Sequence, residues 1–380
     1  MKAMDELHSH LRTRLVGLRE AKDAGTKIIG YTPGGYFPEE VALACGAIPV
    51  GLIRGGEHAP VMHSGAYICR WIDTFCRAQI GYGVSGEDPY YGIIDLLVVP
   101  ITDNHIRAVS DVLDFNTDID IFPYGVPHKK EGATFDYFLH GINRLKGKLE
   151  ELTGREITEA NLREAIQLCN RERELLKQIS LMRKHEMVPI SSKDFIALHH
   201  GTFYADKRFM IKVLETLCRE LEEEVTAPKK GPRILLTGST IALGDNRISD
   251  SIEEAGGVVV VEEFAEGMRP YWDTVEMGGD LMENVASCYF LRRIAPAWFR
   301  PNGERLEFLI HLAKDFRVAG VVWYQLMYRE SYKLESFYFG EILKKEAGLS
   351  MLTVESDYEG SETGSIRSRV EPFVEAIRGI

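Results

Sequence analysis

The sequence lacks the features that would place the protein in a membrane or on nucleic acid. No apolar run approaches the roughly 18 residues that a membrane-spanning helix needs. The first residues, MKAMDELHSHLRTRL, are charged and contain no apolar stretch of the kind found in a secretory signal. Lys and Arg total 45 against 57 Asp and Glu, which gives a formal net charge of −12. This balance disfavours nucleic acid binding, because phosphate backbones bind to clustered basic residues. We therefore expect a cytoplasmic protein with no membrane span and no nucleic acid partner.

Common catalytic and metal-binding motifs are also missing. The six cysteines are scattered without a C-x-x-C pair, which disfavours zinc-ribbon and thioredoxin-like sites. There is no G-x-S-x-G elbow and no Ser-His-Asp order. The Gly-containing turn at 237–240 has no P-loop lysine. Motifs therefore do not assign a reaction, and the fold has to be predicted first.

Short apolar segments alternate with helical patterns in both thirds that flank the middle of the chain. The expected strands are 27–32, 47–53, 93–101, 119–127, 233–240, 258–264, 318–325 and 349–356. Strands separated by helices indicate βαβ units and parallel sheets. We predict an α/β protein with two Rossmann- or flavodoxin-like parallel-sheet domains joined by a helical segment.

Domain boundaries follow from a change of pattern. Apolar residues recur at helical spacing between about 130 and 228, and residues 227–232 have the composition of a linker. The predicted division is an N-terminal α/β domain at 1–129, a helical segment at 130–228 and a C-terminal α/β domain at 229–380. One helix is expected around 66–82 and a final one at about 363–378.

Ligands of open parallel sheets bind at loops beyond the carboxyl ends of the strands. This rule selects five loops: Tyr31–Glu40, Pro100–Arg107, Thr237–Asp245, Glu262–Tyr271 and Gln325–Tyr332. In the third, the backbone N–H groups around Gly238, Ser239 and Thr240 either bind a phosphate or form a plain strand–helix turn.

Three charged residues in these loops are candidates for function. Glu39 lies in the first turn of a predicted helix, where it is either a functional carboxylate or a complement to the helix dipole. Arg107 and Arg329 either meet phosphates or a carboxylate of a ligand, whose geometry a guanidinium matches, or form weak surface ion pairs.

The cysteines divide into two groups by position. Cys69 and Cys76 are seven residues apart, so a helix at 66–82 would place both on one face, either flanking a cofactor or in the core. The others fall on apolar helix faces and are expected to be buried thiols: Cys45, Cys169, Cys218 and Cys288.

Several segments together resemble a known family. GYTPGGYFPEEVALACGAIPVGLIRGG (30–56) is similar to the opening motif of the 2-hydroxyacyl-CoA dehydratase and benzoyl-CoA reductase subunits, and TVESDYEGSETGSIRSRVEPFVEAI (353–377) resembles their terminal motif. The likeness continues in order through 66–81, 95–107 and 136–158, so that it covers nearly the whole chain.

The resemblance implies a heteromeric enzyme that acts on an acyl-CoA substrate. Its partners would be a homologous second subunit and a separate ATP-hydrolysing iron–sulfur activator that supplies one electron. Each subunit of the family typically carries a [4Fe-4S] cluster held by cysteines. The substrate becomes a ketyl radical that loses water, or, in the reductase branch, an aromatic ring takes the electrons.

The implied cluster ligands are mostly replaced in this sequence. Cys69 keeps the first family position, whereas Asp103 stands at the second and Tyr328 or Arg329 at the third. A C-P pair of the family reads Ala295-Pro296. Because iron–sulfur clusters are built on several thiolates, we expect the [4Fe-4S] cluster to be absent or incomplete in this chain.

Four interpretations follow from the sequence. The chain is a dehydratase or reductase subunit that has lost its own cluster, or an active single-cluster enzyme that uses Cys69, Cys76 and oxygen ligands such as Asp103. It is otherwise a non-catalytic paralogue that acts as a binding or assembly module. Outside the family, it is a two-domain protein that binds a small molecule.

Overall fold

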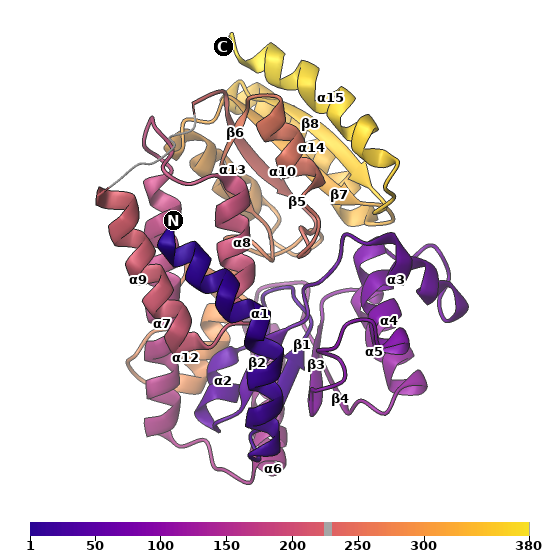
Figure 1. Cartoon of the computed structure of the whole chain (residues 1–380), viewed down its shortest axis with the longest axis vertical. Helices are drawn as coiled ribbons and strands as arrows, with labels where there is room; N and C mark the ends of the chain where they lie inside the picture. Colours follow the sequence, from indigo (N-terminus) through magenta and orange to yellow (C-terminus); the bar gives the residue numbers. More distant parts are fainter. Residues whose placement is uncertain (224–229, 380) are drawn as a thin grey trace.

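The computed structural model of the chain describes residues 1–223 and 230–379. Two α/β units lie one above the other in Figure 1, with a group of long helices along one side. Residues 227–229 of the predicted linker fall outside the described residues. The two-sheet prediction is confirmed, because each unit contains a separate parallel sheet of four strands.

The N-terminal sheet has the strand order β2-β1-β3-β4. Its strands are β1 (Ile28–Tyr31), β2 (Ile48–Gly51), β3 (Leu96–Ile101) and β4 (Ile121–Gly125), all paired in parallel. The central strand β3 reads LLVVPI and is buried except at its end, as expected for a parallel strand covered on both faces. The connecting helices are α2 (Glu39–Ala44), α3 (His58–His63), α4 (Thr74–Ser85) and α5 (Asn104–Asn116).

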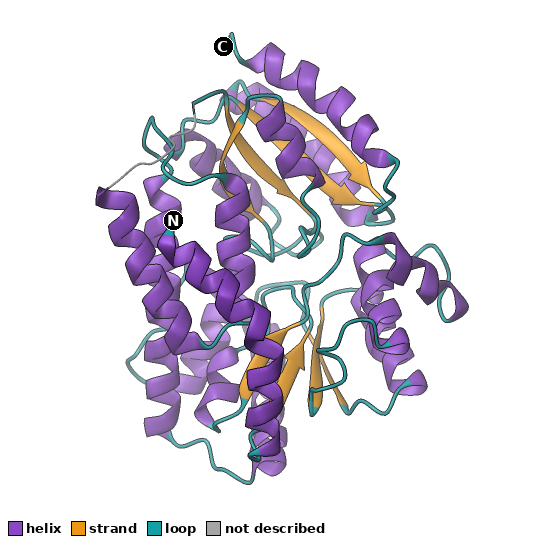
Figure 2. Cartoon of the chain, viewed as in Figure 1, coloured by secondary structure: helices purple, strands orange, loops and turns teal. Residues whose placement is uncertain are grey.

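The C-terminal sheet repeats this arrangement in the order β6-β5-β7-β8. It contains β5 (Arg233–Gly238), β6 (Val258–Glu263), β7 (Gly320–Leu326) and β8 (Ser350–Ser356). Helices α10 (Arg247–Glu254) and α15 (Glu362–Ile377) pack together, as do α13 (Gly303–Asp315) and α14 (Glu330–Ala347). All eight predicted strands are therefore present, and Figure 2 shows the helices that cover both sheets.

The helical segment is more than a connection between the sheets. It consists of α6 (Gly132–Thr153), α7 (Glu159–Met182), α8 (Ser192–Thr202) and α9 (Lys207–Glu223). The N-terminal helix α1 (Lys2–Asp23) packs on α8 and α9. From the C-terminal part, α11 (Arg269–Trp272), α12 (Leu281–Ser287) and η2 (Cys288–Arg292) return to pack on α6 and α7. This return joins the C-terminal unit to the helical segment.

The predicted helix at 66–82 begins later than expected. A short 3₁₀ turn, η1 (Ser64–Ala66), is followed by a segment without regular structure, and α4 starts only at Thr74. The Asp73 carboxylate caps α4 by accepting a hydrogen bond from the Cys76 N–H at 3.1 Å, which is the favoured role of Asp at this position. Cys69 therefore lies outside the helix, and the prediction that it shares a helix face with Cys76 is wrong.

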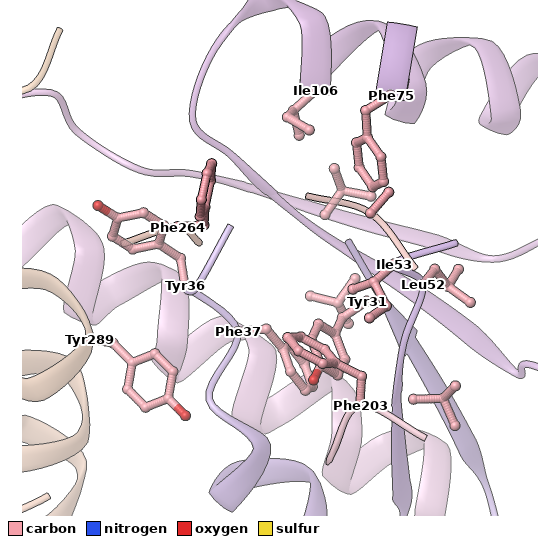
Figure 3. Close-up of a cluster of buried hydrophobic side chains, with 14 of the residues drawn as sticks. Tyr31, Tyr36, Phe37, Leu52, Ile53, Phe75, Ile106, Phe203, Phe264 and Tyr289 are labelled. Atoms are coloured by element: carbon pink, nitrogen blue, oxygen red, sulfur yellow. The ribbon is translucent and has the colours of Figure 1, made fainter. Parts of the chain in front are cut away.

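Apolar side chains form a continuous core between the two units. Figure 3 shows part of it, with Tyr31 of β1, Phe203 at the end of α8 and Phe264 after β6 in one cluster. Phe75 and Ile106 at the edge of this view also line the cavity described below. Part of the cavity wall therefore belongs to this apolar core.

Candidate functional site

A cavity of about 260 Å³ lies between the two units. All five loops selected from the sequence contribute to its wall, so the carboxyl ends of both sheets face a common space. Their lining residues are Pro33, Gly34, Thr102–Ile106, Ser239, Thr240, Ala265, Glu266, Arg269 and 329–332. Phe75, His128 and residues 296–299 complete the wall. The position matches the usual ligand site of such folds.

A buried ion pair crosses the cavity from one unit to the other. The Arg329 guanidinium, at the start of α14, lies 2.6 Å from the Asp103 carboxylate and 3.4 Å from that of Asp73. Burial alone would raise the pKa of both carboxyl groups, but Arg329 and the hydrogen bonds that the carboxylates accept together outweigh burial and lower both pKa values. The two carboxylates in turn raise the pKa of Arg329 despite its burial. All three groups are therefore charged at neutral pH.

Asp73 and Asp103 are held by their own helices as well. Asp103 caps α5 by accepting from the N–H groups of His105 and Ile106 at 2.8 and 3.1 Å. The Asp73 N–H donates to Nδ1 of His105 at 2.8 Å. Nε2 of His105 lies 4.0 Å from the Glu330 carboxylate. Two helix N-termini thus position the cluster.

Glu266, on the loop after β6, and Arg269, at the start of α11, form a second polar group in the wall. Both are almost completely buried. Glu266 Oε2 and both Nη atoms of Arg269 have no hydrogen-bond partner among the described residues. Burial raises the pKa of Glu266 to about 7, although Arg269 and Arg329 oppose the shift. The cavity therefore contains a carboxyl group poised to change its charge near neutral pH.

The predicted turn at 237–240 reaches the same cavity through two residues. Ser239 and Thr240 line the wall, and the Ser239 hydroxyl accepts from the Leu326 N–H at 3.0 Å, which ties the ends of β5 and β7 together. Gly238 has a φ of +141° and lies against the backbone of Tyr324. Its role is close packing of two strands.

Glu39 and Arg107 are placed away from the cavity wall. Glu39 accepts from the Tyr31 hydroxyl at 2.8 Å and from Lys207 Nζ at 2.7 Å, and it lines two other cavities, of about 380 and 50 Å³. Arg107 is exposed and pairs with Asp111, one helical turn away. The functional roles of both stay predictions, but the structure does not bring them together with Arg329.

The thiols do not fit a [4Fe-4S] cluster. Cys69 is exposed in the segment before α4, and Cys76 is buried within α4, where burial and the nearby Asp73 raise its pKa well above the ordinary value. Asp103, the third candidate ligand, is bound to Arg329. Among the described residues, no three His, Cys, Asp or Glu side chains are arranged to hold a metal ion. The other four cysteines are buried, as predicted.

Sequence reasoning had not singled out Asp73, His105, Glu266 or Arg269. The last two belong to the predicted loop at 262–271, but the neighbouring sequence does not indicate that their side chains are buried in the cavity wall. The role of Asp73 could have been predicted from the sequence, because Asp immediately before an apolar helical pattern is a typical N-cap.

Within the described ranges, no helix is both long and apolar enough to cross a membrane.

Comparison with known proteins adds relatives that match over most of their length. The family model described as 2-hydroxyglutaryl-CoA dehydratase, D-component matches residues 35–377. YjiM of Escherichia coli (strain K12), whose dehydratase-subunit name is itself provisional, is 27% identical over 98% of this chain and 97% of that protein. The (R)-phenyllactyl-CoA dehydratase beta subunit of Clostridium sporogenes is 20% identical over 95% of this chain and 94% of its own. A benzoyl-CoA reductase subunit of Thauera aromatica is 24% identical over 79% of this chain and 78% of its own.

Proposed function

The chain belongs to the 2-hydroxyglutaryl-CoA dehydratase D-component family, and from this premise we propose that it is one subunit of a heteromeric, cytoplasmic complex that dehydrates or reduces an acyl-CoA. Its partner is a homologous second subunit. The interdomain cavity receives the acyl end of the substrate. The observation that carries the proposal is the cavity itself, since loops from both sheets line it and the family match spans both.

The size of the cavity supports a small acyl group. Pockets for drug-sized ligands measure roughly 300–1,000 Å³, whereas this one measures about 260 Å³. Its wall combines apolar side chains, among them Phe75, Ile106 and Phe299, with a few polar groups. Such a wall surrounds an acyl chain and excludes water, while the nucleotide part of coenzyme A stays outside.

In the proposed complex, this subunit has no [4Fe-4S] cluster of its own. The support is that the implied ligand positions carry Asp103 and either Tyr328 or Arg329, and that Asp103 and Arg329 bind each other at 2.6 Å. Electron transfer from the ATP-dependent activator is then a task of the partner subunit. The residues described here bind and orient the acyl group and shield it from solvent.

The same ion pair also favours a second candidate. A paralogue that has exchanged its cluster ligands for a salt bridge can serve as a binding or assembly module without turnover. The two candidates share the partner subunit and differ in whether an acyl-CoA enters the cavity.

Co-expression with a homologous, cysteine-rich subunit under anaerobic conditions tests both candidates. Size-exclusion chromatography with light scattering measures assembly, iron analysis and EPR of each separated subunit locate any cluster, and calorimetric titration measures acyl-CoA binding. We expect a heteromer that binds acyl-CoA, with iron in the partner alone. A heteromer that ignores acyl-CoA would favour the assembly module. A monomer that ignores both the partner and acyl-CoA would end the subunit proposal.

An EPR signal of a reduced cubane in the isolated, reconstituted chain would contradict the loss of the cluster. Cys76→Ser then shows whether this buried thiol is a ligand, because the signal would disappear in that variant. Cys218→Ser is the matched control, since Cys218 is also a buried helix thiol but lies on α9, away from the cavity.

A further inference from the structure

Helix α14 has two apolar faces, and one of them is exposed. Its inner face packs on β7, β8 and α13 (Figure 1) and buries side chains such as Phe339 and Leu343. On the opposite side, Leu334, Phe337 and Tyr338 are 64%, 74% and 51% exposed. A helix on the surface of a protein normally carries polar side chains on the face that is turned away from the core. The outer face of α14 departs from this pattern.

The three exposed side chains form one apolar patch. Residues three and four positions apart are neighbours on a helix surface, and Leu334, Phe337 and Tyr338 have this spacing. Phe115 on α5 is a different case. It is 88% exposed, but no other large apolar side chain is exposed on that helix, which lies wholly within the described residues. Single exposed apolar side chains are common, whereas contiguous ones indicate a contact surface.

The charged residues around the patch have opposite signs at equal distances from its centre. Glu330 and Lys344 lie seven residues before and after Phe337. Lys333 and Glu341 lie four residues before and after it. All four charged side chains are exposed. The order of charges is therefore reversed when α14 is read from its other end.

This order makes the outer face of α14 complementary to a second copy that runs in the antiparallel direction. A two-fold symmetric interface uses the same surface on both subunits, so that surface has to be complementary to itself. In the antiparallel pair, Glu330 of one copy lies opposite Lys344 of the other, and Phe337 lies beside its own equivalent. The positive and negative ends of the two helix dipoles also alternate. A parallel pair would place Glu330 beside Glu330 and Lys344 beside Lys344.

We propose that α14 binds a second copy of this chain through an antiparallel helix pair centred near Phe337. The apolar patch supplies the contact, and the charged residues at its two ends fix the direction. The inference goes beyond the proposed function and does not depend on it, because it requires neither an acyl-CoA nor a homologous subunit. In the proposed complex, the same contact joins two heteromers into one symmetric assembly.

Sedimentation equilibrium of the purified chain tests the contact directly. Stable interfaces bury roughly 1,600 Å², and a single pair of helix faces is smaller than this. We therefore expect a dimer that dissociates in the micromolar range. Between about 1 and 200 µM, the measured mass should rise from that of one chain toward that of two.

Phe337→Glu should weaken this dimer strongly. The substitution removes a central aromatic side chain from both copies, so the dissociation constant should rise at least about thirtyfold. Phe115→Glu is the matched control, because it introduces the same charge at an exposed phenylalanine on α5. It should leave the dissociation constant within about twofold of the wild-type value. Far-UV circular dichroism and the thermal midpoint check that both variants are folded.

A charge exchange tests the antiparallel direction. Lys345 lies beside Lys344 in the last turn of α14. Lys344→Glu combined with Lys345→Glu should raise the dissociation constant about fivefold or more, since Glu330 of the second copy then faces carboxylates. Adding Glu330→Lys restores opposite charges and should return the constant to within about twofold of the wild-type value. A parallel pair gives no such rescue.

The outcomes separate this inference from the proposed function. A chain that stays monomeric at the highest concentration overturns the inference, whether or not the variants fold. A dimer that Phe337→Glu leaves intact, or a charge exchange without rescue, overturns it as well. If Phe337→Glu instead releases the homologous subunit from the co-expressed complex, the patch binds that subunit; the inference is then wrong and the proposed function stands. Failure of the complex to bind acyl-CoA affects the proposed function alone.

Discussion

Arg329 shows how one side chain changes the chemistry of a site. It stands near a position where the family resemblance implies a thiolate, and it binds Asp103, which stands at another. The Asp73 side chain is fully buried and that of Arg329 is 10% exposed, so the charges depend on one another. Removing one member of such a group leaves the other charges buried without compensation.

Replacing Arg329 by Met should therefore destabilise the protein strongly. We expect the free energy of unfolding to fall by about 3–5 kcal/mol, since Asp73 and Asp103 lose their counter-charge. Arg107→Met is the control, because Arg107 forms an exposed pair and should change the same quantity by about 0–1 kcal/mol. Urea unfolding at pH 7.5 measures both. Equal losses in the two variants would contradict the structural role of Arg329.

Glu266 makes stability depend on pH. Burial raises its pKa from the ordinary 4.5 to about 7 in the folded protein. The folded state therefore keeps a proton that the unfolded chain has already lost. The resulting contribution to stability is complete below pH 4.5 and disappears as the pH rises through 7.

Glu266→Gln removes this dependence. A difference of about 2.5 between the two pKa values corresponds to about 3 kcal/mol. The free energy of unfolding of the variant minus that of the wild type should increase by about 2–3 kcal/mol as the pH rises from 5 to 8. The measurement is urea unfolding of both proteins across this range. A constant difference between them would show that the Glu266 pKa is not raised.

Among the secondary-structure elements, strands were easier to predict than the segment before α4. Strands such as β3 and β6 are short, mostly apolar runs, and burial on both faces demands that composition. Residues 67–73 contain apolar side chains as well, but the Asp73 cap and the Trp71 contact with Tyr328 of the other unit hold them outside α4. Contacts between units overrode the local helical pattern here.

Gly238 at the end of β5 is expected to tolerate no side chain. Its φ is +141°, and an added Cβ would lie 1.6 Å from the Tyr324 carbonyl oxygen. Gly238→Ala should lower the thermal midpoint markedly or prevent folding, because β5 and β7 are central strands.

Gly147 in α6, in contrast, is expected to tolerate a side chain. Gly147 is exposed and has open space around its Cα, so Gly147→Ala should stabilise the helix by about 0.5–1 kcal/mol. Differential scanning calorimetry compares the two variants. A Gly238→Ala protein as stable as Gly147→Ala would refute the close approach of the two strands.

The whole molecule is held together by contacts between the units on both sides of the cavity. The backbone of Gly55 donates to the Leu243 carbonyl at 2.9 Å, and the Thr74 hydroxyl donates to Asp357 at 2.5 Å. On another side, Lys130 Nζ lies 2.7 Å from Glu304. These contacts, together with the shared apolar core of Figure 3, hold the two units in place on either side of the cavity.

This packing predicts the reactivity of the thiols. Of the six cysteines only Cys69 is exposed, and buried thiols react slowly with external reagents. The native protein should release one equivalent of thionitrobenzoate from Ellman's reagent quickly, against six in guanidinium chloride. Cys69→Ser should abolish the fast equivalent, and Cys169→Ser should leave it unchanged. A second fast thiol would show that the units separate in solution.

The sequence by itself determined the eight strands, the two parallel sheets and the five loops at their carboxyl ends. It did so because apolar periodicity and turn residues act over a few positions of the chain. The resemblance likewise pointed to Asp103 and to the pair Tyr328 and Arg329 from short ordered motifs. The predicted domain boundaries stay predictions, since α1 and residues 269–292 pack with the helical segment.

Only the tertiary structure decided which of these residues meet. Asp103 and Arg329 are 226 positions apart, and whether they form an ion pair depends on how the two sheets face each other. The same holds for Glu266 and Arg269, whose burial results from the elements packed around them. Glu39 had an equally good local pattern, but Lys207 of α9 engages it outside the cavity wall. A sequence pattern specifies the element that carries a side chain, whereas its partners come from packing between distant segments.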